Sequence, residues 1–261
     1  MLYDYFRAKD LTEDSEKRFG CEAEAQALVV AIFKFRDRIN ADDRFVRYKV
    51  LVGFESVYRG HWIDQEFDYE KADEYRRGEA SHYIDEINPA NESEWFDLIG
   101  RCAKTKSNDL ATFPVFGSFI RKLAERRPEV AERFLAKASD DLRNFLTGFL
   151  NGLALSNRRD IYERILESEL QSATCLAGVA RHVRYSDVHM PEFAARLLKR
   201  AIDKADVMPV IECLLFALEY YGTEKIAEAD AFVSARTKKL THERRAVRNF
   251  GTAADYSQGG G

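Results

Sequence analysis

Two histidines and an aspartate lie close together in the sequence, a combination that could bind a metal ion. His182 and His189 are seven residues apart, and Asp187 lies between them. Zinc sites use imidazole and carboxylate ligands, but these must converge on one point. Residues 185–188 are typical of a loop, so the two rings need not share a face. We therefore expect the histidines at the surface and Asp187 as the cap of a helix that starts at Pro191, and we predict no metal site.

Acidic residues are concentrated between positions 64 and 94, where eleven Asp or Glu stand against Lys71, Arg76 and Arg77. Paired carboxylates can act as general acid and base, but nothing distinguishes one pair here from the others. A helix over residues 68–87 with a solvated face, or a docking surface for a basic partner, explains the same pattern. We predict no catalytic residue in this segment.

Other signs of catalysis or of a bound cofactor are missing from the sequence. The four cysteines are far apart and lie in apolar helical patterns, without the paired spacing of metal sites, so we expect buried thiols. The chain has no Gly-x-x-x-x-Gly-Lys-Ser/Thr loop for a nucleotide. We therefore predict a protein that is not an enzyme, with no cofactor.

One short segment has the composition of a protein contact. Trp, Tyr and Arg are common at binding hot spots, and this segment holds Tyr58, Arg59, His61 and Trp62. It is our candidate protein-contact patch, although structural packing of Trp62 is the alternative.

A second polarised segment, residues 236–248, is strongly basic. Its cations are Arg236, Lys238, Lys239, Arg244, Arg245 and Arg248, and its only acidic residue is Glu243. Such a helix could contact phosphates of a nucleic acid, or it could pair with an acidic helix of another molecule. Aromatic side chains for base stacking are absent until Phe250. A solvated or intersubunit helix is the first interpretation, and nucleic acid is the alternative.

The whole composition limits the class of protein. With 46% hydrophobic residues over 261 positions, the chain can bury a continuous core, and a formal charge of −4 argues against a surface built entirely for nucleic acid. The N-terminus lacks the basic and apolar regions of a secretion signal, and no apolar run is long enough for a membrane span. We therefore expect a cytoplasmic protein with no membrane partner.

The elements that position these residues are predicted to be helices. Apolar residues recur at helical spacing from about Cys21, and a second helix is expected to start near Asp42. Asn91 and Glu94 have the form of a capping box, which predicts a helix start at that point. Pro128 and Pro191 each precede Glu and an apolar run, as prolines in a first helical turn do.

These helix starts form a repeat. The eight residues from Pro128 recur from Pro191 with five identities, and the arginines of successive copies stand 32, 31 and 32 residues apart, at Arg101, Arg133, Arg164 and Arg196. A second apolar helix follows each start. In two of these second helices the apolar residues correspond at a constant offset of 65: Phe145, Leu146, Phe149, Leu150 and Leu153 map onto Val210, Ile211, Leu214, Leu215 and Leu218. The repeating unit is therefore predicted to be a helical hairpin.

Period and hairpin form together resemble the HEAT and armadillo class of α-solenoids. The resemblance implies an all-α fold: a right-handed α-solenoid of stacked helical hairpins, with a helical cap region at the N-terminus. The predicted organisation is an N-terminal region over residues 1–90 with the acidic helix, hairpin repeats over 91–250, and a flexible tail over 251–261. The alternative is a helical bundle in which the spacing is accidental.

A narrower similarity involves residues 107–117, which read Ser-Asn-Asp-Leu-Ala-Thr-Phe-Pro-Val-Phe-Gly, together with the acidic helix before them and the Arg-Pro-Glu start at Arg127. This run resembles segments in the C-terminal helical arms of large bacterial STAND-type NTPases. The resemblance implies a sensor arm of a larger bacterial protein.

These features lead us to expect a non-catalytic protein-interaction module, or a scaffold or sensor arm, whose partner is another protein or another domain of a longer chain. The first alternative is a nucleic-acid-associated repeat protein that uses the basic helix. The second is a HEAT-like DNA glycosylase, which would need a basic groove. The predicted inner helices over 141–153 and 206–218 carry few Lys or Arg, which counts against a glycosylase.

Overall fold

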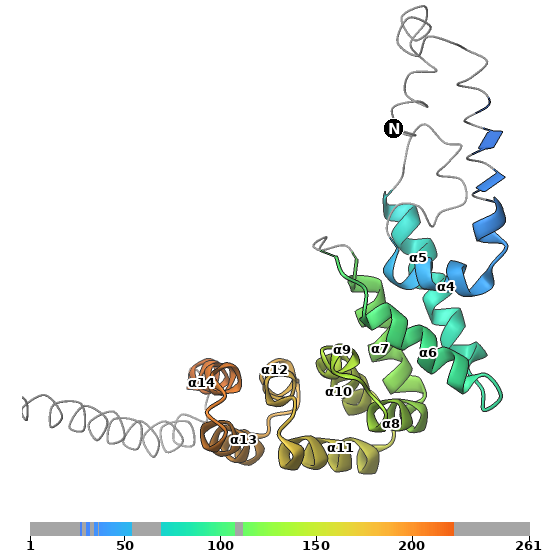
Figure 1. Ribbon diagram of the computed structural model, residues 1–261. Coiled ribbons are helices and arrows are strands. Elements are labelled where there is room, and N and C mark those ends of the chain that lie inside the picture. The colour runs from blue at the N-terminus through green and yellow to red at the C-terminus, as the bar shows by residue number, and fades with distance from the viewer. Residues whose placement is uncertain are drawn as a thin grey trace, which may run out of the picture. The chain divides into compact units, whose positions relative to one another are not determined.

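The computed structural model describes residues 37–107 except 54–68, residues 112–221, and, in the helical turns before position 37, residues 27, 30, 31, 34 and 35. Within these ranges the protein is all-α and has no strand (Figure 1). The contact patch around Trp62 and the basic segment 236–248 lie outside the described residues. The described helices after position 42 are α4 (Asp43–Val52), α5 (Tyr69–Glu86), α6 (Glu92–Ala103), α7 (Pro114–Arg126), α8 (Pro128–Ala136), α9 (Asp140–Arg143), α10 (Leu146–Leu155), α11 (Arg159–Ser172), α12 (Leu176–Tyr185), α13 (Pro191–Asp203) and α14 (Val207–Tyr221).

The chain divides into two compact units between Ile161 and Tyr162, within the first turn of α11. In the first unit, α4 packs on α5, α6 and α7, and α7 packs on α5, α8 and α10. In the second unit, α14 packs on α12 and α13. The described helices before position 91 thus pack directly on those after it, while the predicted limits at residues 90 and 250 stay predictions.

The start and end of α4 follow from local chemistry. The side chain of Asp42 accepts hydrogen bonds from the backbone N–H groups of Arg44 and Phe45, at 3.0 and 3.2 Å, and so caps the first turn. At the other end, the buried guanidinium of Arg76 in α5 donates to the backbone carbonyls of Val50 and Leu51. Terminal carbonyls have no partner within their own helix, so this arginine satisfies them and ties α4 to α5.

The predicted acidic helix over residues 68–87 is α5, and one of its sides is buried. Ala72, Ala80, Tyr83 and Ile84 are at most 8% exposed. Its carboxylates Asp73, Asp85 and Glu86 form ion pairs with Arg77, Arg126 and Arg47 respectively. Much of its negative charge is therefore compensated by arginines of the same unit.

The capping box predicted at Asn91 is wrong, although Asn91 does occupy the N-cap position of α6. Its side chain makes no capping hydrogen bond to that helix. Instead, Asn91 Oδ1 accepts from the Asn88 backbone N–H at 2.8 Å, and its Nδ2 donates to the Glu86 carbonyl at 3.0 Å. The amide holds the turn that follows α5, and this turn occupies the Oδ1 acceptor that a helix cap would use.

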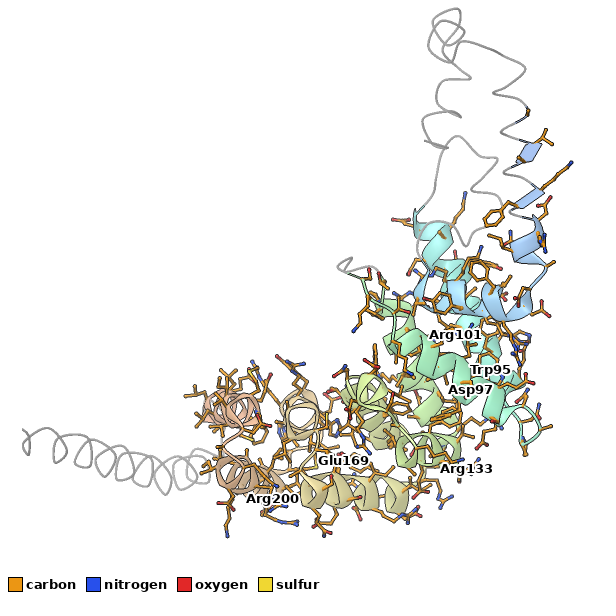
Figure 2. All side chains as sticks on the ribbon, in the orientation of Figure 1. Trp95, Asp97, Arg101, Arg133, Glu169 and Arg200 are labelled. Carbon is orange, nitrogen blue, oxygen red and sulfur yellow. The ribbon has the colours of Figure 1, made fainter. Side chains whose placement is uncertain are left out.

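The core of the first unit is centred on Trp95, which is 1% exposed and projects from α6 (Figure 2). Its ring centroid lies 5.6 Å from that of Tyr83 in α5 and 6.2 Å from that of Phe119 in α7. The Arg47 guanidinium of α4 lies 4.9 Å from the Trp95 ring centroid and donates to Glu86 at 3.0 Å. One tryptophan therefore joins four helices through apolar packing and a cation–π contact.

The predicted arginine register agrees with burial in the structure. Arg101, Arg133, Arg164 and Arg196 lie in α6, α8, α11 and α13, and each is exposed. Each is followed by two buried residues, for example Phe134 and Leu135 after Arg133. Arg133 pairs with Glu92 of α6, and Arg196 pairs with Glu167 of α11. The same local pattern therefore recurs in alternating helices, which is compatible with a helical repeat.

The helix predicted over residues 141–153 is interrupted. It forms the short α9, a break at Asn144 and Phe145, and then α10. After the break, α10 runs very close to α7: a Cβ atom added at Gly152 would lie 2.0 Å from the Arg121 carbonyl oxygen and 2.7 Å from Ala124 Cβ. Only glycine permits this approach of the two backbones.

We predict that Gly152→Ala lowers the free energy of unfolding by at least about 2 kcal/mol, because α7 and α10 must move apart. Urea denaturation of the full chain followed by circular dichroism measures this change. The matched control is Gly100→Ala in α6, where an added Cβ meets nothing within 4 Å. That change should stabilise the protein by about 0.5–1 kcal/mol. Equal effects of the two substitutions would contradict the close contact.

Candidate interaction surface on helix α14

Helix α14 is apolar on more sides than the neighbouring helices cover. Its side against α12 and α13 holds Cys213, Phe216 and Ala217, which are 1%, 7% and 3% exposed. Its other side carries five large apolar side chains in contact with solvent: Val207 (65% exposed), Met208 (47%), Ile211 (42%), Leu214 (38%) and Leu218 (66%). We call these five residues the α14 face. In Figure 1, α14 is the last labelled helix, drawn in orange beside α12 and α13.

The α14 face matches positions that are buried in α10. At the offset of 65 residues, Leu146, Phe149 and Leu153 of α10 correspond to Ile211, Leu214 and Leu218. The three α10 side chains are 0% exposed. The opposite sides also correspond, since the offset places Gly152, which contacts α7, at the position of Ala217, which is buried in the second unit. The two helices thus have the same pattern of apolar sides. Both sides are buried in α10, whereas one side of α14 is exposed to solvent.

An exposed apolar surface of this kind usually marks an interaction site. Full burial of one Leu, Ile, Val or Met side chain is worth about 1.5–3 kcal/mol. Covering the five partly exposed side chains would therefore contribute several kcal/mol. Single exposed apolar residues are common on monomers, whereas a contiguous patch on one helix is typical of a surface that binds protein.

Ion pairs fix the orientation of α14. Arg184 of α12, 16% exposed, donates to Glu212 at 3.0 Å and to Glu219 at 2.6 Å, and Arg181 contacts Glu212 at 3.2 Å. The hydrogen bond from Arg184 lowers the pKa of Glu219. Both carboxylates are therefore engaged with α12, which holds α14 in one rotation and keeps the α14 face directed away from its neighbours.

A second surface feature lies in the first unit, in a groove of about 510 Å³ between α6 and α8. Phe96 and Phe134 line it with their ring centroids 5.3 Å apart. At the rim, Nε and Nη2 of Arg133 donate to the two carboxylate oxygens of Glu92, each at 2.7 Å. These hydrogen bonds lower the pKa of Glu92. Because the two charges compensate each other, the groove offers less for recognition than the α14 face.

The prediction for the histidines was wrong in two respects. His182 lies in α12 and is 0% exposed, and its Nε2 is 2.7 Å from the Tyr162 hydroxyl. His189 is exposed, as predicted. The N-cap of α13 is Met190, without a side-chain cap, so Asp187 does not cap this helix. His182 shares the buried side of α12 with Val179 and Val183. The prediction considered only the loop over residues 185–188 and not the helical spacing before it.

Among the residues that the structure describes, no group of His, Cys, Asp and Glu could hold a metal ion. In the same ranges no helix is both long enough and apolar enough to cross a membrane. The sequence signal for the α14 face was present in the offset of 65, which gives α10 and α14 the same pattern of apolar sides. The offset does not state which of these sides is covered, so the exposure of the α14 face was missed.

Burial lowers the pKa of His182 to about 4. In the unfolded chain an imidazole takes up its proton near pH 6.5. Between these two values the unfolded state binds more protons than the folded state, so stability falls as the pH is lowered from 6.5 to 4. We predict a loss of up to about 3 kcal/mol over this interval from His182 alone.

Urea denaturation of the full chain at pH 6.5 and pH 4.5 measures this loss. His182→Gln removes the titrating group and should flatten the dependence on pH, whereas the exposed His189→Gln should leave it intact. An unchanged dependence in His182→Gln would show that this histidine is not buried in its neutral form.

Comparison with known proteins gives no relative from which a function could be transferred. The chain matches no protein-family model, no curated protein and no solved structure. A function is therefore inferred from the α14 face and from the repeated pattern of burial.

Proposed function

We propose that this chain is a non-catalytic protein-interaction scaffold. It is a right-handed α-solenoid of stacked helical hairpins, similar to HEAT and armadillo proteins, and its α14 face receives a further helical element. That element belongs to another protein or to another domain of a longer chain, as in the sensor arm of a larger bacterial protein.

The α14 face is the observation that carries this proposal. A single hairpin cannot bury both of its apolar sides, so a hairpin in a stack depends on the next one to cover it. The equivalent positions of α10 are buried, which supports an apolar helix surface as the element that the α14 face receives. Because α14 is held in place by Arg184, the docking surface exists before the partner arrives. Preorganisation of this kind reduces the entropic cost of binding.

The α14 face favours a polypeptide over a nucleic acid as its ligand. Its five side chains carry no charge, whereas affinity for nucleic acid depends chiefly on cations that meet phosphates. The basic segment 236–248 is the part of the chain that would support nucleic-acid binding. Polypeptide binding would therefore involve the α14 face, and nucleic-acid binding would involve residues 236–248. A crosslinker placed on the α14 face tests the first function separately from the second.

We predict that a photo-crosslinking benzoylphenylalanine at position 218 of the full chain captures polypeptide. Illumination is carried out in a lysate of cells that make the protein, and acceptor peptides are identified by mass spectrometry. Because Leu218 is 66% exposed, the substitution should not disturb the fold. Capture at 218 should exceed capture at position 204 several-fold, since Lys204 is exposed but lies outside the α14 face.

Equal capture at the two positions would reject a docking surface on α14. The nucleic-acid function is tested separately, by titrating the full chain with duplex DNA at increasing salt concentration. Binding that weakens steeply with salt, and is lost on neutralising Lys238, Lys239, Arg244 and Arg245, would favour that alternative over the scaffold.

A further inference from the structure

We propose that the groove between α6 and α8 binds a short segment of a partner protein in which an aromatic side chain stands next to a carboxylate. Every residue that lines this groove precedes Tyr162 and so belongs to the first unit. The groove is therefore separate from the α14 face, which belongs to the second unit. It gives the proposed scaffold a second contact site with a defined ligand chemistry.

The floor of the groove is aromatic. Phe134 of α8 is 2% exposed, and its ring is inclined at 54° to that of the half-buried Phe96 of α6. Pro89, in the turn before α6, is a third apolar lining residue. A further aromatic ring packs well against such a pair, because tilted and offset arrangements of rings are favourable. The groove volume of about 510 Å³ is typical of ligand sites, which run from about 300 to 1,000 Å³.

The charges that line the groove favour an anion beside the ring. The ionisable lining residues are Glu92, Arg133 and Lys137. Arg133, labelled in Figure 2, makes two hydrogen bonds to Glu92, so these two charges balance each other. The exposed Lys137 forms no ion pair within the part of the chain that the structure describes. One positive charge is thus left over, and a carboxylate of the ligand would complement it.

The start of α6 adds to the positive potential of the groove. Glu92 and Ser93, which line the groove, are the first two residues of this helix. The Asn91 side chain makes no capping hydrogen bond, so it leaves the N–H groups of the first turn without a side-chain acceptor. The partial positive charge of a helix N-terminus favours an anion near its first turn. Lys137 and the start of α6 therefore favour the same ligand group.

The openness of the groove to solvent favours a polypeptide as its ligand. Pro89, Ser93, Arg133 and Lys137 are all exposed. A side chain can therefore enter while the ligand backbone continues across the surface. A nucleic acid would meet one uncompensated cation in this groove, whereas its affinity depends on several contacts between cations and phosphates.

The test uses the purified, ²H,¹⁵N-labelled full chain and three capped dipeptides: acetyl-Phe-Asp-amide, acetyl-Phe-Asn-amide and acetyl-Ala-Asp-amide. We expect the first to shift the amide signals of Ser93, Phe96 and Lys137 in a titration followed by NMR. It should bind about two- to five-fold more tightly than the Asn peptide, which lacks the charge. It should bind at least about five-fold more tightly than the Ala peptide, which lacks the ring. Equal affinities for the three peptides, shifts confined to other residues, or no shift at the solubility limit would overturn the proposed site.

Charge reversal at Lys137 provides a second measurement with a matched control. Lys137 and Lys104 are both exposed and both occupy the C-cap of a helix, but Lys104 lies at the end of α6 away from the groove. Lys137→Glu should abolish the preference for the Asp peptide over the Asn peptide, whereas Lys104→Glu should keep it. Circular dichroism should be the same for both variants. A preference that persists in Lys137→Glu would overturn the proposed site. Neither variant alters the α14 face, so capture at position 218 tests the proposed function independently.

Discussion

The fold depends on one constraint, which is that a helix with apolar residues on two sides must be covered on both. A hairpin of two such helices cannot satisfy this condition alone, so each hairpin has to pack against a neighbour. In the first unit α7 meets it by packing on α5, α8 and α10, and the contact with α10 is so close that only glycine fits at position 152. In the second unit, α14 meets the condition on one side only.

Polar interactions in this protein mainly orient helices that apolar packing has brought together. Arg76 satisfies the terminal carbonyls of α4, Arg47 links Trp95 to Glu86, and Arg184 joins α12 to two glutamates of α14. Each arginine connects two or more helices through donors that lie in one plane, a geometry that lysine cannot supply. An ion pair with an exposed partner, such as Arg184 with Glu219, adds little stability, but it helps to fix the rotation of α14, which decides which side of that helix meets solvent.

The proposed function follows from the same constraint. A surface that is apolar, held in place and equivalent to a buried surface elsewhere in the chain is one that needs a helix against it. The proposed scaffold function rests on this requirement, since a helix that docks on α14 would bury its exposed apolar side chains. Such a function needs no catalytic group, because recognition then depends on apolar area and helix register.

The sequence by itself determined the all-α class, the helix starts at Asp42, Pro128 and Pro191, and the arginine register, because these depend on spacing within a few turns of one chain. It also predicted the acidic helix near its observed limits. The tertiary structure alone decided that His182 is buried, and that Ile211, Leu214 and Leu218 are exposed while their equivalents in α10 are buried. Helical periodicity states which residues share a side, but whether that side is covered depends on segments distant in the sequence.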